Sequence, residues 1–107
     1  MRPTNLTRFR DTSSKYYTML QEILVSKQKD YGPSNIANAP GGPLNGLRVR
    51  IYDKVSRINN LVETGAEPEN ESLRDSFYDL ANYAVIALMV IDDKWPNPKE
   101  WDADGTE

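Results

Sequence analysis

The 107-residue sequence contains no cysteine and no histidine. Without cysteine, the chain has no disulfides, no thiolate nucleophile and no iron–sulfur or cysteine-ligated zinc site. Without histidine, it lacks the usual general base and every imidazole metal ligand. Any chemistry must therefore come from carboxylates, Lys, Arg, Tyr, hydroxyl and backbone groups, or from a hard cation bound through oxygen.

Long hydrophobic runs are absent as well. The longest apolar stretch, residues 83–91, is much shorter than the roughly 20 residues that span a membrane. The first ten residues contain arginines but no following apolar run, so no secretory signal is expected. The formal charge of −3 argues against dedicated binding to nucleic acid or to anionic membranes. We therefore expect a soluble, cytoplasmic protein.

Apolar residues recur at helical spacing in three segments, which predicts a single all-α domain over residues 1–107 with its core at about 12–93. The expected helices cover about 12–29, 47–63 and 71–93, with N-cap oxygens from residues 11–13 and from Asn70. The short 64–69 connection makes the second and third helices an antiparallel hairpin. The Pro/Gly-rich segment 33–46 is expected to be a loop, and the tail from residue 94 to be irregular, docking through its tryptophans.

The predicted third helix is apolar on two sides. One side is expected to pack inside the domain and consists of Leu73, Phe77, Leu80, Ala84, Leu88 and Ile91. The other side begins after Tyr83 and consists of Ile86, Met89 and Val90. A helix that is apolar all round is buried on both sides, so a second copy is expected to cover this other side in a homodimer or larger homo-oligomer.

Polar side chains form facing rows on the predicted hairpin. The third helix carries, within one sector of about 80°, Glu71, Asp75, Asp79 and Asn82. The second helix carries at helical spacing Arg50, Lys54 and Arg57. The rows could neutralise each other as interhelical ion pairs. They could also form a pocket for Mg²⁺ and the phosphates of a nucleotide, since Mg²⁺ is usually held by one or two carboxylates plus substrate phosphates.

The pocket interpretation assigns roles to individual residues. The candidate nucleotide-binding residues are Lys29, Tyr31, Arg50, Lys54, Arg57 and Asn82. Tyr31 would stack on a base. The candidate metal ligands, which would also be the catalytic groups of an enzyme, are Glu71, Asp75 and Asp79. Neither phosphate-binding pattern, GxxxxGK[ST] or GxGxxG, occurs in the sequence.

Three segments together resemble a known family. These segments are Lys29–Gly32, Arg50–Arg57 and Glu71–Tyr83, within a match of roughly 27–87. They are similar to the first nucleotide-modification-associated domain, a small and largely phage and prophage family. The resemblance implies a nucleotide-handling protein that acts in the cytoplasm of an infected or lysogenic bacterial host.

A more distant resemblance is to the all-α MazG-like nucleoside triphosphate pyrophosphohydrolases. That family binds Mg²⁺ with an ExxE on one helix and an ExxD on the next. The third helix fits through Glu71 with Asp75, or through Asp79 with Asn82, whereas the second offers the sequence 53–56, DKVS, followed by Arg57. Three hypotheses therefore stay open: a nucleotide-binding protein, a Mg²⁺-dependent pyrophosphohydrolase, and a non-enzymatic protein that binds a host factor.

Overall fold

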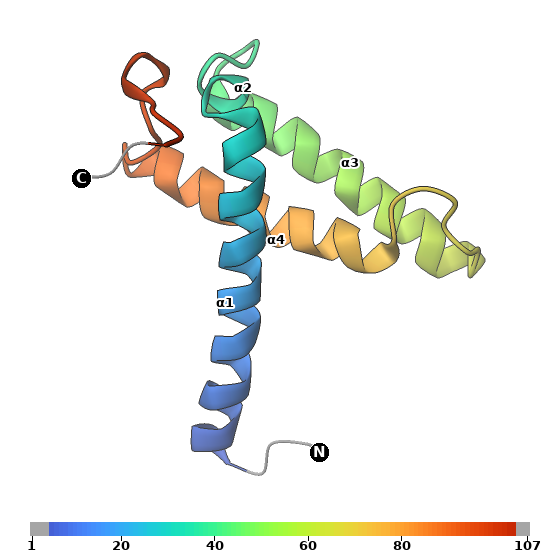
Figure 1. The fold of residues 1–107 in the computed structure, drawn as a ribbon. Helices are drawn as coiled ribbons and strands as arrows, with labels where there is room; N and C mark the ends of the chain where they lie inside the picture. The colour runs from blue at the N-terminus through green and yellow to red at the C-terminus, as the bar shows by residue number, and fades with distance from the viewer. Residues whose placement is uncertain (1–4, 105–107) are drawn as a thin grey trace.

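The computed structural model describes residues 5–104, and this part of the chain contains helices and no strand (Figure 1). The elements are α1 (Leu6–Tyr31), α2 (Ser34–Ala37), α3 (Pro43–Thr64), α4 (Leu73–Ile91) and a 3-10 helix, η1 (Pro98–Glu100). The predicted all-α class with three main helices is confirmed. No helix in the described range is long and apolar enough to cross a lipid bilayer.

The helix α1 is longer than predicted at both ends. Its N-cap is Asn5, whose side chain accepts a hydrogen bond of 2.9 Å from the backbone N–H of Arg8. The predicted caps at residues 11–13 are wrong, because these residues lie inside the helix. There the Ser13 hydroxyl donates to the Arg10 carbonyl at 3.1 Å and so tolerates a helical position. The helix ends at Gly32, which has a φ of 65°.

The segment 33–46 is more ordered than the predicted loop. It contains α2 and the first turn of α3, which begins at Pro43. Proline suits the first position of a helix because the N–H that it lacks would have no intrahelical partner there. Gly46 lies where α2 and α3 approach each other, and a Cβ at this position would come within 2.6 Å of the Ala39 side chain. The glycines thus permit a close turn rather than a long loop.

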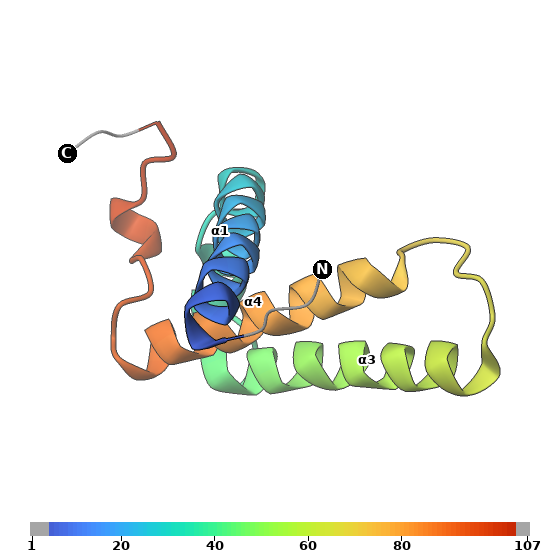
Figure 2. The same cartoon turned by 90° about the horizontal axis from the view of Figure 1, so that it is seen from below.

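The helices α3 and α4 lie side by side as the predicted hairpin (Figures 1 and 2). The helix α3 ends at Gly65, which adopts the left-handed conformation (φ 68°) and donates to the Leu61 carbonyl at 3.0 Å. The N-cap of α4 is Ser72 and not the predicted Asn70, since the Ser72 hydroxyl accepts the Asp75 N–H at 3.0 Å. Glu71 therefore precedes α4 and reaches the site from the turn.

The hydrophobic core lies where α2, α3 and α4 meet. Its buried members are Ile36, Leu47 and Ile86. Partly buried side chains packed around them are Leu24, Tyr83, Ala87, Val90 and Trp95. Trp95 docks the tail, because its indole N–H donates to the Pro33 carbonyl at 3.0 Å.

The side of α4 that packs inside this chain is the one that was predicted to face a second copy. Ile86 and Val90, which were expected to meet a second copy, belong to the core of this chain. Phe77, Leu88 and Ile91, which were expected to be internal, are exposed. The reason is that α1, α2 and the Trp95 segment all cover the Ile86 side, and periodicity within α4 alone cannot say which side its neighbours will cover.

The helix α1 crosses α4 with its C-terminal half, while its N-terminal half projects away from the other helices (Figures 1 and 2). None of its residues is fully buried. Leu20, Ile23 and Leu24 are half-buried, whereas Phe9 and Tyr16 are exposed. The contact of α1 with the body therefore lies near the residues that approach the candidate site.

Candidate functional site

The inward side of α3 is partly cationic. Arg50, Lys54 and Arg57 recur at helical spacing and are all half-buried beside apolar residues of the same helix. A lysine or arginine removed from water is costly unless an anion or a hydrogen-bond acceptor compensates it. The partners supplied by α4 and by the turn before it are therefore the first determinants of what this site can do.

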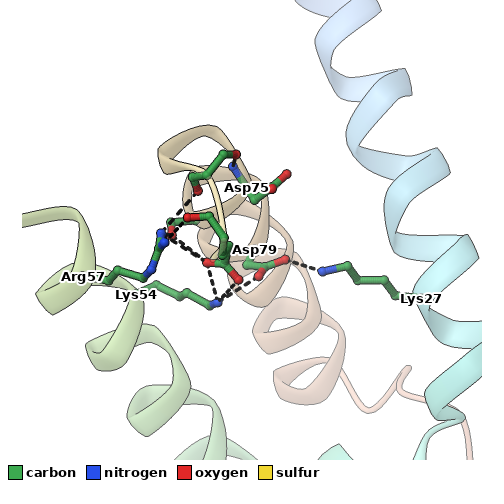
Figure 3. Close-up of polar contacts among 8 residues, drawn as sticks. Lys27, Lys54, Arg57, Asp75 and Asp79 are labelled. Atoms are coloured by element: carbon green, nitrogen blue, oxygen red, sulfur yellow. Dashed lines mark hydrogen bonds and ion pairs between the residues drawn. The ribbon is translucent and has the colours of Figure 1, made fainter. Parts of the chain in front are cut away.

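Lys54 is held between two carboxylates (Figure 3). Its Nζ lies 2.9 Å and 3.0 Å from the two Glu71 carboxylate oxygens and 3.0 Å from Asp79 Oδ2. The side chains of Lys54 and Asp79 are only 19% and 12% exposed, so this is a mostly buried ion triad. The predicted pairing of the two polar rows is confirmed for these residues.

Asp79 also joins α4 to α1. Its Oδ1 lies 2.6 Å from Lys27 Nζ, so one carboxylate binds a cation from each neighbouring helix (Figure 3). Lys27 was not among the predicted site residues. Its position at the end of the apolar stripe of the first helix, after Leu20, Ile23 and Leu24, was the feature that could have identified it. A lysine in such a stripe must extend towards solvent or meet an acid.

Arg57 anchors the turn before α4. Its guanidinium donates to the Ser76 hydroxyl at 2.6 Å, to the Ser72 carbonyl at 3.3 Å and to the Glu71 carbonyl. Ser76 is fully buried and donates in turn to a Glu71 carboxylate oxygen at 2.7 Å. Sequence reasoning missed Ser76, because a serine in a helix carries no pattern of its own. We refer to Lys27, Lys54, Arg57, Glu71, Ser76 and Asp79 as the polar network.

The network shifts the pKa values of its acids and lysines. Burial alone would raise the pKa of Asp79, but hydrogen bonds from Lys27 and Lys54 outweigh it and hold this pKa below its usual range. Burial would likewise raise the pKa of Glu71, and hydrogen bonds from Ser76 and Lys54 lower it. The Asp79 hydrogen bond raises the pKa of Lys27, and the paired carboxylates raise that of Lys54 against the effect of its burial. All four groups are therefore charged at neutral pH.

A cavity of about 240 Å³ lies beside the network, between α1, α2, α3 and α4. Its aromatic lining consists of Tyr31, Tyr83 and Trp95. Its amide lining consists of Gln28, Asn35 and Asn82. Lys27, Lys54, Glu71 and Asp79 reach it from the network, and Arg50 reaches it from α3. The cavity thus combines flat apolar surfaces with hydrogen-bonding groups and fixed charge.

Arg50 is the cation in this cavity that has no acidic partner within residues 5–104. Its guanidinium lies 6.0 Å from the centre of the Tyr83 ring and donates one hydrogen bond of 3.5 Å to the Asn35 carbonyl. Two buried amide atoms of the lining, Gln28 Nε2 and Asn35 Oδ1, also have no hydrogen-bond partner among the described residues. Buried polar atoms are nearly always paired, so these two lining side chains hold hydrogen-bonding capacity that the described residues leave unused.

The polar network and most of the cavity lining lie within the part of the chain that matches a known family. The family model of nucleotide modification associated domain 1 matches residues 27–91. The chain belongs to this family. No curated protein and no solved structure matches the chain.

The boundaries of the family domain coincide with features of the site. The match begins at Lys27, which binds Asp79, and ends at Ile91, the last residue of α4. It therefore includes every member of the polar network and leaves the projecting half of α1 outside. Trp95 is the residue of the cavity lining that follows the family domain.

The predicted nucleotide-binding residues divide into two groups. Tyr31, Arg50, Lys54 and Asn82 line the cavity. The Asn82 amide also donates to the Leu20 carbonyl at 3.0 Å, which ties α4 to α1. Lys29 and Arg57 do not line the cavity; Lys29 is exposed on α1, and Arg57 is engaged at the turn.

The predicted metal ligands are also divided. Glu71 and Asp79 share the Lys54 ammonium, while Asp75 is exposed and takes no part in their ion pairs (Figure 3). Within the described range, no group of three or more acidic side chains is placed to hold a metal ion. A cation bound by Glu71 and Asp79 would have to displace Lys54. The arrangement therefore does not fit a protein-held Mg²⁺, and this ligand set stays a prediction.

Proposed function

We propose that this domain binds a nucleotide in the cavity between α1, α3 and α4, with Arg50 on the phosphate. The coarse association with nucleotide modification comes from the family. The finer proposal is supported above all by Arg50, a cation that lines the cavity without an acidic partner among the described residues. An arginine with unused N–H donors is well suited to phosphate, because its planar fork can donate two parallel hydrogen bonds.

The rest of the lining suits a base and a sugar. Tyr31, Tyr83 and Trp95 provide flat surfaces on which a base can stack, and stacking tolerates any base. Gln28 Nε2 is an unused donor and Asn35 Oδ1 an unused acceptor, as the edge of a base requires. In this proposal the polar network has a supporting role. It fixes α1 and α4 relative to α3. It also pairs Lys27 and Lys54 with carboxylates, so that these lysines do not compete with Arg50 for the phosphate.

The proposed setting is the cytoplasm of a bacterium that carries a phage or prophage. There the domain would bind a nucleotide or modified nucleotide, or deliver it to a modifying enzyme. Mg²⁺ would enter bound to the phosphates rather than in a cage of side chains, as is common for this ion.

A thermal-shift series tests the proposal directly. The protein is melted with nucleosides and with nucleoside mono-, di- and triphosphates, each with and without Mg²⁺. A ligand at 100 times its Kd adds about 2.7 kcal/mol to stability. For a domain of this size that is a rise in Tm on the order of 10 °C. The absence of a shift with every nucleotide would contradict the proposal.

Arg50→Gln and Arg48→Gln form a matched pair for the phosphate assignment. Both residues are on α3, but Arg48 is exposed, pairs with the Asn45 side chain at 2.8 Å and does not line the cavity. The proposal expects Arg50→Gln to lose most of the difference between nucleotide and nucleoside, and Arg48→Gln to retain it. Equal shifts for the two variants would show that Arg50 does not bind the phosphate.

The same samples address the two other hypotheses. Pyrophosphate release that stops with EDTA and with Asp79→Asn would establish the pyrophosphohydrolase instead of simple binding. If the wild type responds to no nucleotide, and a double variant, Lys54→Met with Asp79→Leu, stays folded and still captures the same host protein as the wild type, the host-factor hypothesis is favoured instead.

A further inference from the structure

The side of the α3–α4 hairpin that faces away from the cavity is apolar and uncovered. It carries six apolar side chains that are between 38% and 63% exposed. We call these residues the outer face: Leu44, Val55 and Val62 on α3, and Phe77, Leu88 and Ile91 on α4. Large exposed apolar surface on two packed helices is a feature of sites of association.

The helical geometry puts the two rows on one side. On α3, Leu44, Val55 and Val62 are spaced by 11 and 7 residues and fall within about 20° of one another. On α4, Phe77, Leu88 and Ile91 are spaced by 11 and 3 residues and form a second stripe about 60° wide. At 100° per residue, the cavity-lining residues Arg50 and Lys54 lie about 80–140° from the α3 stripe, and Ile86 lies about 180° from Phe77, so both stripes are turned away from the cavity. Neither stripe contains a charged residue.

The chain also exposes more surface than a compact chain of its mass. A compact chain of 12.2 kDa is expected to expose about 6,000 Å². This chain exposes 8373 Å². Its radius of gyration is 16.2 Å, against about 13 Å for a compact chain of this length. The excess surface is more than twice the roughly 800 Å² that each partner contributes to a standard interface.

We propose that two copies of the chain pack outer face against outer face in a twofold-symmetric dimer. Two hairpins placed this way form a four-helix arrangement, which is the usual way for such pairs to bury a shared apolar side. An uncharged patch suits an interface with its own copy, since a twofold axis brings each patch against itself without repulsion between like charges. The two cavities then open away from the interface, so dimerisation and ligand binding are independent.

The projecting half of α1 is the other exposed apolar surface, and it fits a second copy less well. Its exposed apolar residues are Leu6, Phe9, Tyr16 and Tyr17. The same segment carries an excess of positive charge from Arg8, Arg10 and Lys15 against Asp11. Two such segments packed together would repel each other. The outer face lacks this obstacle.

Light scattering after size exclusion tests the dimer with a matched pair of variants. The wild-type chain is expected at twice its mass of 12.2 kDa, and Leu88→Glu at the single mass, with its helical circular dichroism retained. Val49→Glu is the control. Val49 is an exposed apolar residue, as Leu88 is, but it lies on α3 outside the outer face. A wild-type chain that remains a monomer at high micromolar concentration overturns the proposal. So does a dimer that Leu88→Glu leaves intact and Phe9→Glu dissociates.

Cross-linking gives a second readout that does not require a destabilising charge. The chain has no cysteine, so Ala84→Cys and Val49→Cys each introduce a single reactive thiol. Ala84 lies on the same side of α4 as Phe77 and Leu88. A short bis-maleimide should link two Ala84→Cys chains much more efficiently than two Val49→Cys chains. Equal or reversed yields overturn the proposal even if Leu88→Glu fails to fold.

Discussion

The two sides of the α3–α4 hairpin differ in chemistry and in what covers them. The cavity side combines the apolar core with lysines, arginines and carboxylates and is covered by α1, α2 and the Trp95 segment. The outer face carries Leu, Val, Ile and Phe and has no cover among residues 5–104. A soluble domain ordinarily keeps its apolar side chains inside and its charges outside.

This difference indicates how a small chain divides its surfaces. Only three apolar residues of the described chain are buried. The contact of α1 with α4 combines the packing of Leu24 on the core with polar contacts, notably the Lys27–Asp79 ion pair and the hydrogen bond from Asn82 to the Leu20 carbonyl. The interior of the hairpin maintains a polar site, and its apolar surface is left for association. The predictions below test whether substitutions on the two sides differ in their effect on the free energy of unfolding.

The largest effect is expected at the core. Leu47→Ala should lower the free energy of unfolding by about 3 kcal/mol, since Leu47 is 1% exposed and its removal leaves a cavity. Leu44→Ala, three residues earlier on the outer face, should cost less than about 1 kcal/mol in dilute protein. Urea denaturation measures both. Similar losses would mean that the outer face is packed within a single chain.

Asp79→Leu should have the next largest effect, a loss of about 2 kcal/mol in the free energy of unfolding measured by urea denaturation. It leaves Lys54 mostly buried with one of its two carboxylates removed, and an uncompensated buried charge is costly. Adding Lys54→Met should restore much of the loss, because packed apolar groups can replace an ion pair. Asp75→Leu is the control on the same helix and should change stability by less than about 1 kcal/mol, since Asp75 is exposed. A double variant less stable than Asp79→Leu alone would contradict this account.

Stability should also fall at acid pH through the same carboxylates. Asp79 and Glu71 have lowered pKa values in the folded chain, so their contribution is complete above the ordinary values of 3.8 and 4.5. It is lost as the pH falls through the lowered folded values. The raised pKa values of Lys27 and Lys54 act at the other end, and stability declines as the pH rises through and above 10.5. Denaturation between pH 2 and 8 should give a shallower acid limb for Asp79→Asn; an unchanged limb would show that Asp79 contributes nothing to it.

The smallest effect is expected on the outer face of the separated chain. Leu88→Gln should alter unfolding by no more than about 0.5 kcal/mol when the protein is too dilute to associate, because Leu88 is 61% exposed. At high concentration the same variant should be less stable than the wild type, since only the wild type gains from pairing. A large loss at every concentration would place Leu88 in the core of the monomer.

Helical periodicity predicted the three main helices, their hairpin and the meeting of Lys54 with Asp79. These features follow from spacing within one or two neighbouring segments. The extra turns of α1 and the helix α2 were missed, because Ser, Thr, Asp, Pro and Gly are compatible with both helix and loop. The N-cap at Ser72 was missed for the same reason, since Asn70 is an equally good candidate by residue type.

The cavity required information that no single segment contains. Lys27 and Asp79 are 52 positions apart, and their contact depends on the angle at which α1 crosses α4. The assignment of the two sides of α4 depends on Ile36 and Trp95, which lie in segments without periodicity. Arg50 could be predicted as inward-facing, but its lack of an acidic partner becomes visible only when the whole network has been placed.

The length of α1 has a mechanical consequence. Lys27, Gln28 and Tyr31 form a wall of the cavity, while the helix extends from them to Leu6. The helix is held to α4 as far back as Leu20, and from there 1.5 Å per residue gives a projecting arm of about 20 Å. A pivot of about 5° at this contact, as a ligand enters the cavity, would move the far tip by about 2 Å. A fluorophore attached near that tip would therefore report whether the cavity is occupied, although it is far from the cavity itself.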